Sequence, residues 1–325
     1  MKTALITGVA GQDGRHLAEL LLKKDYTVYG MLNGQGSASS QLITEELPQV
    51  IQVRGDLADS SSLSRVLEET KPDEIYNLAA ISFVGMSFHQ PELTANITGL
   101  GVLRLLEAVR TAKLQDSVRL YQASSSEMFG KVQSIPQNEK TPFYPRSPYG
   151  VSKVFAHQAC VNYREAYNMH VSCGILFNHE GEKRGSEFVT RKITQTVARI
   201  KYGMAKELRL GDLTPKRDWG YAGDYVEAMW KMLQMETPDD YVIATGETHS
   251  VQEFVDLSFA AAGMADESPQ FVVRDERFVR PSEVALLVGD ASKAHEKLGW
   301  KPKTTFEELV KKMVEHDLNL EAKKL

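Results

Sequence analysis

The stretch Thr7-Gly-Val-Ala-Gly-Gln-Asp-Gly14 follows a short apolar run, Thr3–Thr7, and leads into a segment of helical periodicity, Asp13–Lys24. Its three glycines have no Cβ, so the backbone can turn tightly and approach a ligand closely. The helix that follows then offers free N–H groups and the positive end of its dipole to a pyrophosphate. A plain glycine turn is the alternative for an isolated motif. The position at the first strand–helix junction favours dinucleotide binding instead.

Short apolar strands alternate with longer amphipathic helices through the first half of the chain. The predicted strands are Thr3–Thr7, Thr27–Met31, Val50–Arg54, Glu74–Leu78, Val118–Gln122 and Val171–Leu176. The predicted helices are Asp13–Lys24, Ser60–Thr70, Pro91–Ala112 and Pro148–Asn168. This alternation predicts an α/β fold: a Rossmann-like, doubly wound parallel sheet with helices on both faces and a smaller C-terminal substrate-binding domain.

The last third of the chain mixes proline, charged and aromatic residues among shorter elements. Helices are expected at Arg191–Gly203, Ala222–Met235, Val251–Gly263 and Phe306–Leu320. We expect a dinucleotide-binding domain at 1–176 and a substrate-binding domain at 177–325. Asp240–Thr245 has the composition of another buried strand, so a segment near 220–246 is expected to rejoin the sheet.

The overall composition is that of an ordinary globular protein. Of the 325 residues, 42% are hydrophobic and 25% are charged, and the formal net charge of −5 gives no reason to expect nucleic acid. No apolar run approaches the roughly 20 residues of a membrane helix, and an early first strand argues against a leader. Cys160 and Cys173 lack metal-ligand spacing, so we expect reduced packing residues, no metal and a cytoplasmic protein.

A tyrosine and a lysine four residues apart occur in Ser147-Pro-Tyr-Gly-Val-Ser-Lys153. Ser147 is expected to cap a helix that has Pro148 in its first turn. Tyr149 and Lys153 then share one helical face, where the lysine cation is expected to lower the tyrosine pKa from near 10 toward the working range. This makes Tyr149 a candidate base for a sugar hydroxyl. An exposed helical pair is the alternative, and the glycine turn upstream disfavours it.

Three serines and an acid follow the fifth predicted strand, in Gln122-Ala-Ser-Ser-Ser-Glu-Met-Phe-Gly130. In an extended segment, residues two apart point to the same side, so Ser125 and Glu127 are expected to share a direction. Ligands bind at the carboxyl ends of strands in open α/β sheets. We expect Ser125 to hydrogen-bond a substrate hydroxyl and Glu127 to act on a neighbouring carbon. A polar turn capped by an acid is the alternative.

Glu127 suggests one proton transfer beyond the chemistry of an alcohol dehydrogenase. Once a sugar C4 hydroxyl is oxidised, the C5 proton lies next to a ketone and becomes acidic enough for a carboxylate to remove. Water can then leave from C6, and the hydride held by a nicotinamide can be delivered to C6. The sum is an internal redox dehydration to a 4-keto-6-deoxy sugar, without net consumption of cofactor.

Several long segments resemble the GDP-mannose 4,6-dehydratase family, within the extended short-chain dehydrogenase/reductase superfamily. They are TGVAGQDG, GDLADSSSL, YNLAA, QASSSEMFG, TPFYPRSPYGVSK, ILFNHEGEKRGSEFVTRKI, KRDWGYAGDYVEAMW, YVIATGETHSVQEF, RPSEV and GDASKAHEKLGWKP, which together span nearly the whole chain. The resemblance implies an NADP-dependent hydro-lyase of nucleotide-sugar metabolism and deoxysugar biosynthesis. Its expected reaction converts GDP-mannose to GDP-4-keto-6-deoxymannose.

The resemblance also assigns roles to individual residues. It implies that Ser125, Glu127, Tyr149 and Lys153 are catalytic. It implies cofactor contacts from Gly8, Gly11, Gln12, Asp13, Gly14, Asp56, Leu57, Leu78, Ala79, Ala80, Ser82, Tyr149, Lys153, His179 and Arg184. It implies GDP-sugar contacts from Ser82, Ser125, Asn178, Val189, Lys192, Arg217, Arg280 and Glu283. Forked arginine cations suit phosphates, although a solvated surface charge is the alternative for each.

Two departures from the family pattern bear on the cofactor. Members typically carry Arg-Arg-Ser after the second strand, which grips the NADP 2′-phosphate and bridges subunits of a tetramer. This chain has Leu32-Asn-Gly-Gln-Gly-Ser-Ala-Ser-Ser40 there, with no basic residue between Lys24 and Arg54. It also lacks the acid at the strand end that usually marks NAD. We therefore expect NADP, with NAD still open and Arg54 or Arg184 as replacement cations. In the second departure, Gly181-Glu-Lys replaces the usual Ser-Pro-Arg.

The residues leave several alternatives open. GDP-heptose is an alternative substrate to GDP-mannose, because the two differ only beyond C6. A GDP-sugar reductase or 4-epimerase of the same superfamily is another alternative, but neither needs a C5 base such as Glu127. A regulatory binder without catalysis would have little reason to keep Tyr149, Lys153 and Glu127 together. By resemblance, the long helices at Pro91–Ala112 and Pro148–Asn168 imply a homodimer, and a tetramer stays open.

Overall fold

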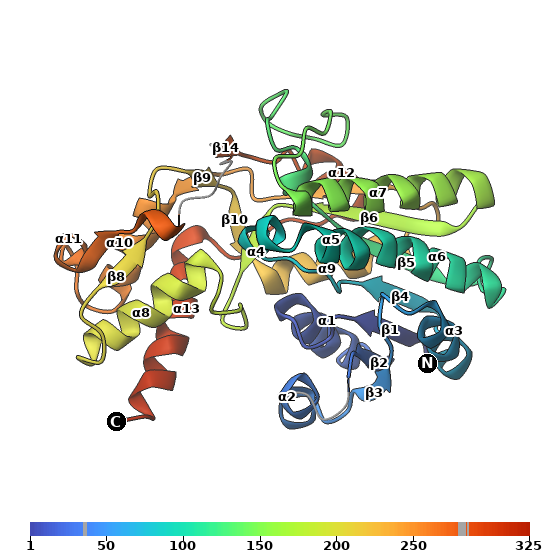
Figure 1. Cartoon of the computed structure of the whole chain (residues 1–325), viewed down its shortest axis with the longest axis horizontal. Helices are drawn as coiled ribbons and strands as arrows, with labels where there is room; N and C mark the ends of the chain where they lie inside the picture. The colour runs from blue at the N-terminus through green and yellow to red at the C-terminus, as the bar shows by residue number, and fades with distance from the viewer. Residues whose placement is uncertain (35–37, 279–283, 285) are drawn as a thin grey trace.

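A seven-stranded sheet, built mainly from the first half of the chain, forms the centre of the fold (Figure 1). The computed structural model describes residues 1–34, 38–278, 284 and 286–325. The strands of the sheet are β1 (Thr3–Thr7), β2 (Thr27–Leu32), β3 (Ile51–Arg54), β4 (Glu74–Asn77), β5 (Arg119–Ser125), β6 (His170–Leu176) and β11 (Asp240–Ile243). Their order is β11-β6-β5-β4-β1-β2-β3, and each of these pairings is parallel. The predicted α/β fold with a doubly wound parallel sheet is confirmed.

Helices cover both faces of this sheet. One face carries α1 (Gln12–Leu22), α2 (Ala38–Glu46) and α9 (Ala222–Gln234), and the other carries α3 (Ser60–Thr70), α6 (Gly101–Thr111) and α7 (Pro148–Tyr167). In β1, Ala4 and Ile6 pack into the first layer and Leu5 into the second. A parallel strand buried on both faces needs an apolar residue at every position, which is why β1 is a continuous apolar run.

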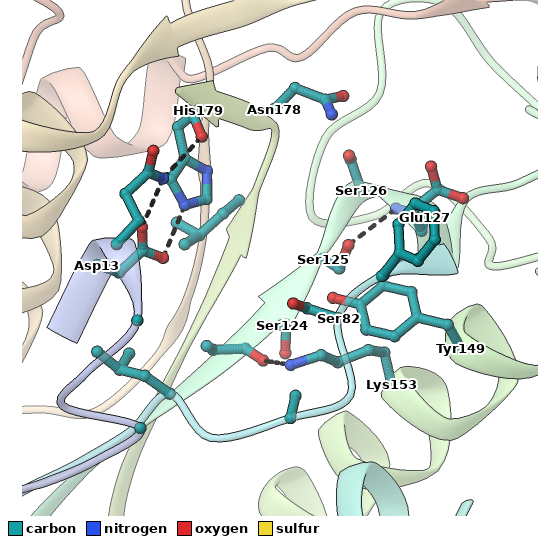
Figure 2. A pocket seen from close by; sticks show the side chains of 18 of the residues that line it. Asp13, Ser82, Ser124, Ser125, Ser126, Glu127, Tyr149, Lys153, Asn178 and His179 are labelled. Atoms are coloured by element: carbon teal, nitrogen blue, oxygen red, sulfur yellow. Dashed lines mark hydrogen bonds and ion pairs between the residues drawn. The ribbon is translucent and has the colours of Figure 1, made fainter. Parts of the chain in front are cut away.

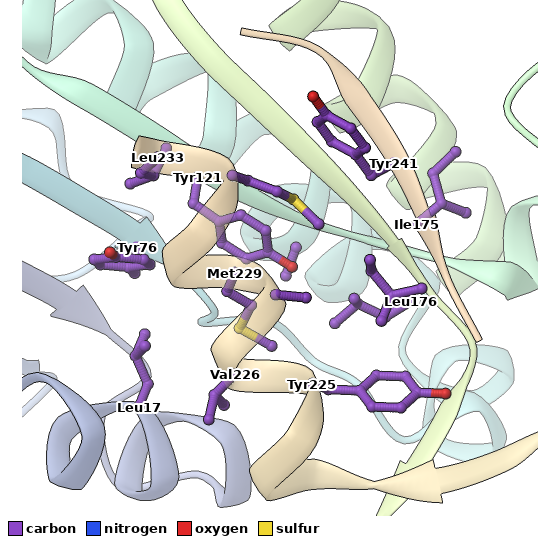
Figure 3. Close-up of a cluster of buried hydrophobic side chains, with 14 of the residues drawn as sticks. Leu17, Tyr76, Tyr121, Ile175, Leu176, Tyr225, Val226, Met229, Leu233 and Tyr241 are labelled. Atoms are coloured by element: carbon purple, nitrogen blue, oxygen red, sulfur yellow. The ribbon is translucent and has the colours of Figure 1, made fainter. Parts of the chain in front are cut away.

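Helix α9 brings the C-terminal half of the chain onto the sheet (Figure 3). Val226, Met229 and Leu233 on α9 belong to the same buried cluster as Leu17 on α1 and Tyr76 on β4. β11 follows α9 and pairs with β6, so the strand expected near 240–245 is part of the sheet. The division into domains at residue 176 stays a prediction.

The hydroxyl of Tyr121, on β5, is expected to destabilise this core. The side chain is fully buried, and its Oη has no hydrogen-bond partner within the described residues. Gly174 on β6 faces it, because a Cβ there would lie 2.4 Å from the Tyr121 Oη. A buried hydroxyl without a partner destabilises a fold by about 1–3 kcal/mol.

We therefore expect Tyr121→Phe to raise the free energy of unfolding by about 1 kcal/mol. Gly174→Ala is expected to destabilise, and adding Tyr121→Phe to it should recover part of that loss, because the closest clashing atom is gone. Urea unfolding of the parent, the two single variants and the double variant measures both effects. A Tyr121→Phe variant less stable than the parent would show that the hydroxyl has a partner.

The C-terminal part packs around Trp219. Its ring stacks on Phe306 with centroids 6.0 Å apart and meets Phe254 edge-on at 5.4 Å. The helices of this part are α8 (Val189–Lys201), α10 (Val251–Ala261), α11 (Ser268–Phe271) and α13 (Phe306–Ala322). Helix α12 (Ser292–Leu298) instead packs against α9 and β11. Its short strands are β7 (Asn178–Glu180), β8 (Leu208–Leu210), β9 (Lys216–Arg217), β10 (Trp219–Tyr221), β12 (His249–Ser250), β13 (Val272–Arg274) and β14 (Leu286–Leu287). None of the helices in the described residues combines the length and hydropathy needed to cross a bilayer.

The helices before β5 differ from the sequence expectation. The helix expected at Pro91–Ala112 is interrupted, since α5 (Pro91–Thr94) leads into a π-helical turn, Ala95–Leu100, before α6 begins. Two further helices, α2 and α4 (Val84–His89), were not predicted. Short or interrupted helices carry too few turns of periodicity to be recognised in a sequence.

Candidate active site

One cavity of about 200 Å³ opens where β1, β4, β5 and β6 end, beside the first turns of α1 and α7 (Figure 2). Most of the residues singled out in the sequence line it: Gly8, Gly11, Gln12, Asp13, Gly14, Leu78, Ala80, Ser82, Ser125, Glu127, Tyr149, Lys153, Asn178, His179 and Arg184. They come from distant parts of the chain, and the carboxyl ends of parallel strands bring them to one edge of the sheet. The glycine turn, the serine–acid segment and the tyrosine–lysine pair thus form one site.

The glycine turn is packed too closely to accept side chains. A Cβ on Gly8, at φ +71°, would lie 2.8 Å from the backbone nitrogen of Ala79. A Cβ on Gly14 would lie 2.4 Å from the Gly8 carbonyl oxygen. Helix α1 begins at Gln12, and its N-cap, Gly11, provides no side-chain hydrogen bond. No N-cap side chain therefore competes for the first-turn N–H groups, and this end of the cavity fits the pyrophosphate of a dinucleotide.

Asp13 and His179 tie the first turn of α1 to β7. The Asp13 Oδ2 lies 2.8 Å from the His179 Nε2, and the Gln12 side-chain amide donates to the His179 carbonyl at 3.0 Å. Burial alone would raise the pKa of Asp13, but the charge of His179 and its hydrogen bond hold that pKa well below its usual range. Burial would lower the pKa of His179, yet Asp13 raises it above its ordinary value. Asp13 and His179 therefore form an ion pair in the wall of the cavity.

Helix α7 presents the tyrosine–lysine pair as the sequence predicts. The Ser147 Oγ accepts a first-turn N–H at 3.0 Å, and Pro148 occupies the first helical position. Tyr149 and Lys153 are both buried and both line the cavity. The Lys153 Nζ donates to the Ala123 carbonyl at 2.6 Å and lies 5.7 Å from the centre of the Tyr149 ring. The lysine is thus anchored to β5.

The expectation that Lys153 lowers the pKa of Tyr149 is wrong. Burial raises the pKa of Tyr149 to about 12, and a hydrogen bond with Ser125 offsets this only in part. Burial also lowers the pKa of Lys153 to about 8. Removing a group from water disfavours its charged form, and the four-residue spacing carries no information about that burial. Tyr149 needs further positive charge beside it to act as a base near neutral pH.

Lys153→Met is expected to stabilise the fold. The pKa of Lys153 is about 8 when folded, against 10.5 for an unperturbed lysine, so folding releases its proton between these pH values. The free energy of unfolding then rises with pH across that window, and the charged lysine is destabilising at pH 7. We expect the variant to gain on the order of 2 kcal/mol at pH 7 and to lose this pH dependence.

Urea unfolding at pH 7 and at pH 10 measures the effect of Lys153→Met. The exposed Lys301 is a suitable matched control, and Lys301→Met should leave both stabilities close to those of the parent. A variant at position 153 that is no more stable than the parent at pH 7 would contradict the assigned desolvation.

The serine–acid segment is a turn and not an extended strand. β5 ends at Ser125, and Ser126–Met128 form a 3-10 turn, so the alternation of a strand does not reach Glu127. The shared direction expected from an extended segment was therefore derived from the wrong geometry. The Ser125 Oγ accepts the Glu127 N–H at 3.2 Å, and this turn leaves both residues on the cavity wall (Figure 2). The Ser124 Oγ instead lies 2.9 Å from the His157 Nδ1 and joins β5 to α7.

The other predicted site residues lie outside this lining. Asp56, Leu57, Ala79, Val189, Lys192 and Arg217 are described but are not among the lining residues. Arg280 and Glu283 fall outside the described residues. Lys192, on α8, is half-buried, with its Nζ 3.2 Å from the centre of the Phe278 ring and no hydrogen-bond partner among the described residues. Burial lowers the pKa of this lysine.

Three phenylalanines of the cavity wall, Phe83, Phe177 and Phe188, were not predicted. Phe83 and Phe188 meet edge-on with centroids 5.8 Å apart, and the Arg184 guanidinium lies 3.5 Å from the centre of the Phe188 ring. Arg184 also pairs with Glu180 at 2.9 Å. The further lining residues are Val84, Ala123, Ser124, Ser126 and Leu176. Apolar residues in loops are ordinary, so only the position of Phe83 next to Ser82 could have indicated its place.

Comparison with known proteins gives the family. The family model described as GDP-mannose 4,6 dehydratase matches residues 5–313. The chain is 52% identical over 329 residues to GDP-mannose 4,6 dehydratase 1 of Arabidopsis thaliana, which covers 98% of this chain and 90% of that protein. The chain belongs to the GDP-mannose 4,6-dehydratase family. The Homo sapiens GDP-mannose 4,6 dehydratase is 50% identical over 341 residues, or 98% of this chain and 91% of its own.

A solved structure of another enzyme shares the fold. The UDP-glucose 4-epimerase of Thermus thermophilus, in complex with NAD, matches with a TM-score of 0.83 and 28% identity over 97% of this chain and 98% of that chain. The resemblance to the GDP-mannose 4,6-dehydratase family drawn from the motifs is confirmed, and so is the predicted hydro-lyase class.

The loop that departs from the GDP-mannose 4,6-dehydratase pattern, Gly181–Lys183, is held by contacts to α1. The Arg15 Nη2 donates to the Lys183 carbonyl at 2.6 Å. The Lys183 ammonium forms an ion pair with Glu19. The altered loop is therefore fixed against the same helix whose first turn faces the cavity.

Proposed function

We propose that this chain converts GDP-mannose to GDP-4-keto-6-deoxymannose, with loss of one water and no net consumption of cofactor. The observation that carries the proposal is the presence of Glu127 in the same cavity as Ser125, Tyr149 and Lys153. The last three groups suffice to oxidise an alcohol. A carboxylate beside them adds the base that an elimination requires, and a simple reductase or epimerase has no use for it.

We infer that the cofactor is NADP, with its pyrophosphate at the first turn of α1. Leu32 ends β2 and Asn33 follows it, so no acid stands where an NAD site usually holds the ribose hydroxyls. The epimerase of similar fold was solved with NAD, and the missing acid favours the phosphorylated form for this chain. When bound, the oxidised nicotinamide supplies a positive charge and a hydride acceptor that takes hydrogen from C4 and returns it at C6.

Tyr149 acts as the base for the sugar C4 hydroxyl. Tyr149 and Ser125 line the same cavity, where both hydroxyl groups can contact the same substrate oxygen. Lys153 is fixed on the Ala123 carbonyl in the same cavity. The further positive charge that a Tyr149 phenolate needs would come from the oxidised nicotinamide. Tyr149 takes the hydroxyl proton as the C4–O bond becomes a carbonyl.

Glu127 then removes the proton from C5, which the new C4 carbonyl has made acidic. The electron pair left at C5 forms the C5–C6 double bond as the C6 hydroxyl leaves, and the proton from Glu127 departs with it as water. Tyr149 then gives the proton it holds to C5, and the hydride that a bound nicotinamide would supply at C6 would complete the product. Protons and electrons balance over the cycle, and both side chains return to their starting states.

We propose that the GDP part of the substrate lies toward β7 and the start of α8. The Asn178 Oδ1 and the Lys192 Nζ have no hydrogen-bond partner in the described residues, which leaves an acceptor and a cation for a ligand. The oxygens of a diphosphate can accept the hydrogen bonds that such a lysine has to donate. Contacts from Val189, Arg217, Arg280 and Glu283 stay predictions.

Mass analysis of the reaction tests the function. The purified chain is incubated with GDP-mannose, with and without added NADP, and GDP-heptose is run in parallel. The expected product of GDP-mannose is lighter by one water, and no reduced cofactor accumulates. Turnover of GDP-heptose alone would assign the chain to that substrate. Accumulation of reduced cofactor, or no loss of water from either sugar, would overturn the proposal.

We propose that the chain acts as a homodimer in the cytoplasm. Leu93, Leu100, Val151 and Phe155 each expose more than two fifths of their surface and come from α5, the π-helical turn and α7, which pack together. An apolar face of this kind suits a second copy of the chain. Light scattering that gives the mass of a single chain at micromolar concentration would overturn the dimer.

A further inference from the structure

The end of β2 lacks the charge that an NADP site requires. In dinucleotide folds the adenosine ribose meets the end of the second strand, where an acid accepts the 2′-hydroxyl or a nearby arginine accommodates the 2′-phosphate. Here Leu32, Asn33 and Gly34 stand at this point, and none of them is charged. If the cofactor carries a 2′-phosphate, its cation must come from another element of the fold.

Arg54 reaches this point from the neighbouring strand. It is the last residue of β3 and lies in register with Leu32, the last residue of β2. Its guanidinium donates to the carbonyl oxygen of Gly34. The positive charge therefore lies beside the chain segment that follows β2, although the residue is 20 positions further along the sequence.

The charge of Arg54 is not neutralised within the described part of the chain. No carboxylate there lies within ion-pair distance of it, and its one hydrogen bond as a donor goes to a backbone carbonyl. Arg65, an exposed residue of α3, donates to the Arg54 carbonyl at 3.3 Å and adds a second cation nearby. Such a guanidinium keeps most of its donors available for the oxygens of a phosphate.

Arg184, the other candidate for this role, is committed elsewhere. It pairs with Glu180 at 2.9 Å and stacks on Phe188. It lines the cavity together with Tyr149 and Glu127. The geometry thus separates two arginines that the sequence could not distinguish.

We propose that Arg54 binds the 2′-phosphate of the adenosine ribose and is the residue that makes this chain prefer NADP to NAD. The inference rests on the part of the proposed function that places a nicotinamide dinucleotide in the cavity, and it is independent of the sugar. The arginine comes from β3 and takes the place of a cation in the loop after β2. Arg65 supports it through the local positive charge.

Binding measurements without any sugar test the proposal. Isothermal titration with NADPH, NADH, 2′,5′-ADP and 5′-AMP compares ligands that differ by the 2′-phosphate. The parent should bind the phosphorylated member of each pair more tightly, and added salt should weaken that preference. Arg54→Ala should lose roughly 10- to 100-fold in affinity for NADPH and 2′,5′-ADP, and its affinities for NADH and 5′-AMP should stay unchanged.

Matched variants separate a direct contact from a structural effect. Arg54→Lys keeps a positive charge without the fork and should recover part of the preference. Arg199→Ala removes an exposed arginine of α8 and should leave all four affinities unchanged. Equal affinity of the parent for NADPH and NADH would overturn the proposal, as would an Arg54→Ala variant that loses all four ligands equally.

The failure of this inference can be told apart from that of the proposed function. A chain that dehydrates GDP-mannose but binds NADPH and NADH alike retains its function and refutes the role of Arg54. A chain that shows the Arg54-dependent preference but turns over no GDP-sugar supports the role and refutes the function. Binding of neither dinucleotide would refute both.

Discussion

Glu127→Gln is expected to lower turnover of GDP-mannose by about 10²- to 10⁴-fold. The amide has nearly the same size and shape as the carboxylate, and Ser125 can still accept the backbone N–H of residue 127 that shapes the turn. The glutamine side chain has no lone pair basic enough to remove the C5 proton. The affinity for the sugar nucleotide and the unfolding temperature should therefore stay close to those of the parent.

The variant should stop at a defined point of the cycle. Tyr149 and Lys153 are intact in it, so C4 is still oxidised and the absorbance of reduced nicotinamide should appear and persist after mixing. Glu165→Gln changes an exposed carboxylate of α7 and serves as the matched control. A Glu127→Gln variant with nearly parental turnover would remove the carboxylate from the mechanism and leave a plain oxidoreductase site.

Tyr149→Phe should abolish the first step of the same reaction, with a loss of about 10²- to 10⁴-fold. In the proposed mechanism the phenol oxygen takes the C4 hydroxyl proton, and the phenyl ring of the variant still fills the buried site on α7. In contrast to the Glu127 variant, no reduced nicotinamide should appear on mixing. Tyr167→Phe, at the exposed end of the same helix, is the control.

Comparing the Glu127→Gln and Tyr149→Phe variants gives the order of the two proton transfers. Appearance of reduced cofactor in the Tyr149→Phe variant at the rate of the parent would show that another group, such as Ser125, accepts the proton. Loss of sugar-nucleotide binding in either variant would show that the side chain holds the substrate and that its effect on turnover is indirect.

Local signals in the sequence predicted much of the site. The glycine turn was recognised because close backbone approach excludes a Cβ, and Gly8 and Gly14 show that exclusion in the fold. Tyr149 and Lys153 were placed on one face because helical spacing and the Ser147 cap are local properties. Their position relative to the glycine turn follows from the parallel sheet, which the alternation of strands and helices had predicted.

Properties set by the whole fold were not predicted. The pKa of Tyr149 depends on how deeply its side chain on α7 is buried. The four-residue spacing of Tyr149 and Lys153 in the sequence carries no information about that burial. Glu127 faces the cavity from a 3-10 turn, and strand alternation gave the wrong reason for its position. Phe83 and Phe188 meet across the cavity from segments more than 100 residues apart, so no local pattern relates them.

The account rests on an elimination that begins with removal of the C5 proton, and isotope incorporation tests it most directly. The parent protein is supplied with GDP-mannose in heavy water, and the product is examined by proton NMR at C5. We predict one solvent-derived deuterium at C5 in the product, and none in the residual substrate when the Glu127→Gln variant is used. A parent product that retains the original hydrogen at C5 throughout the reaction would contradict the account.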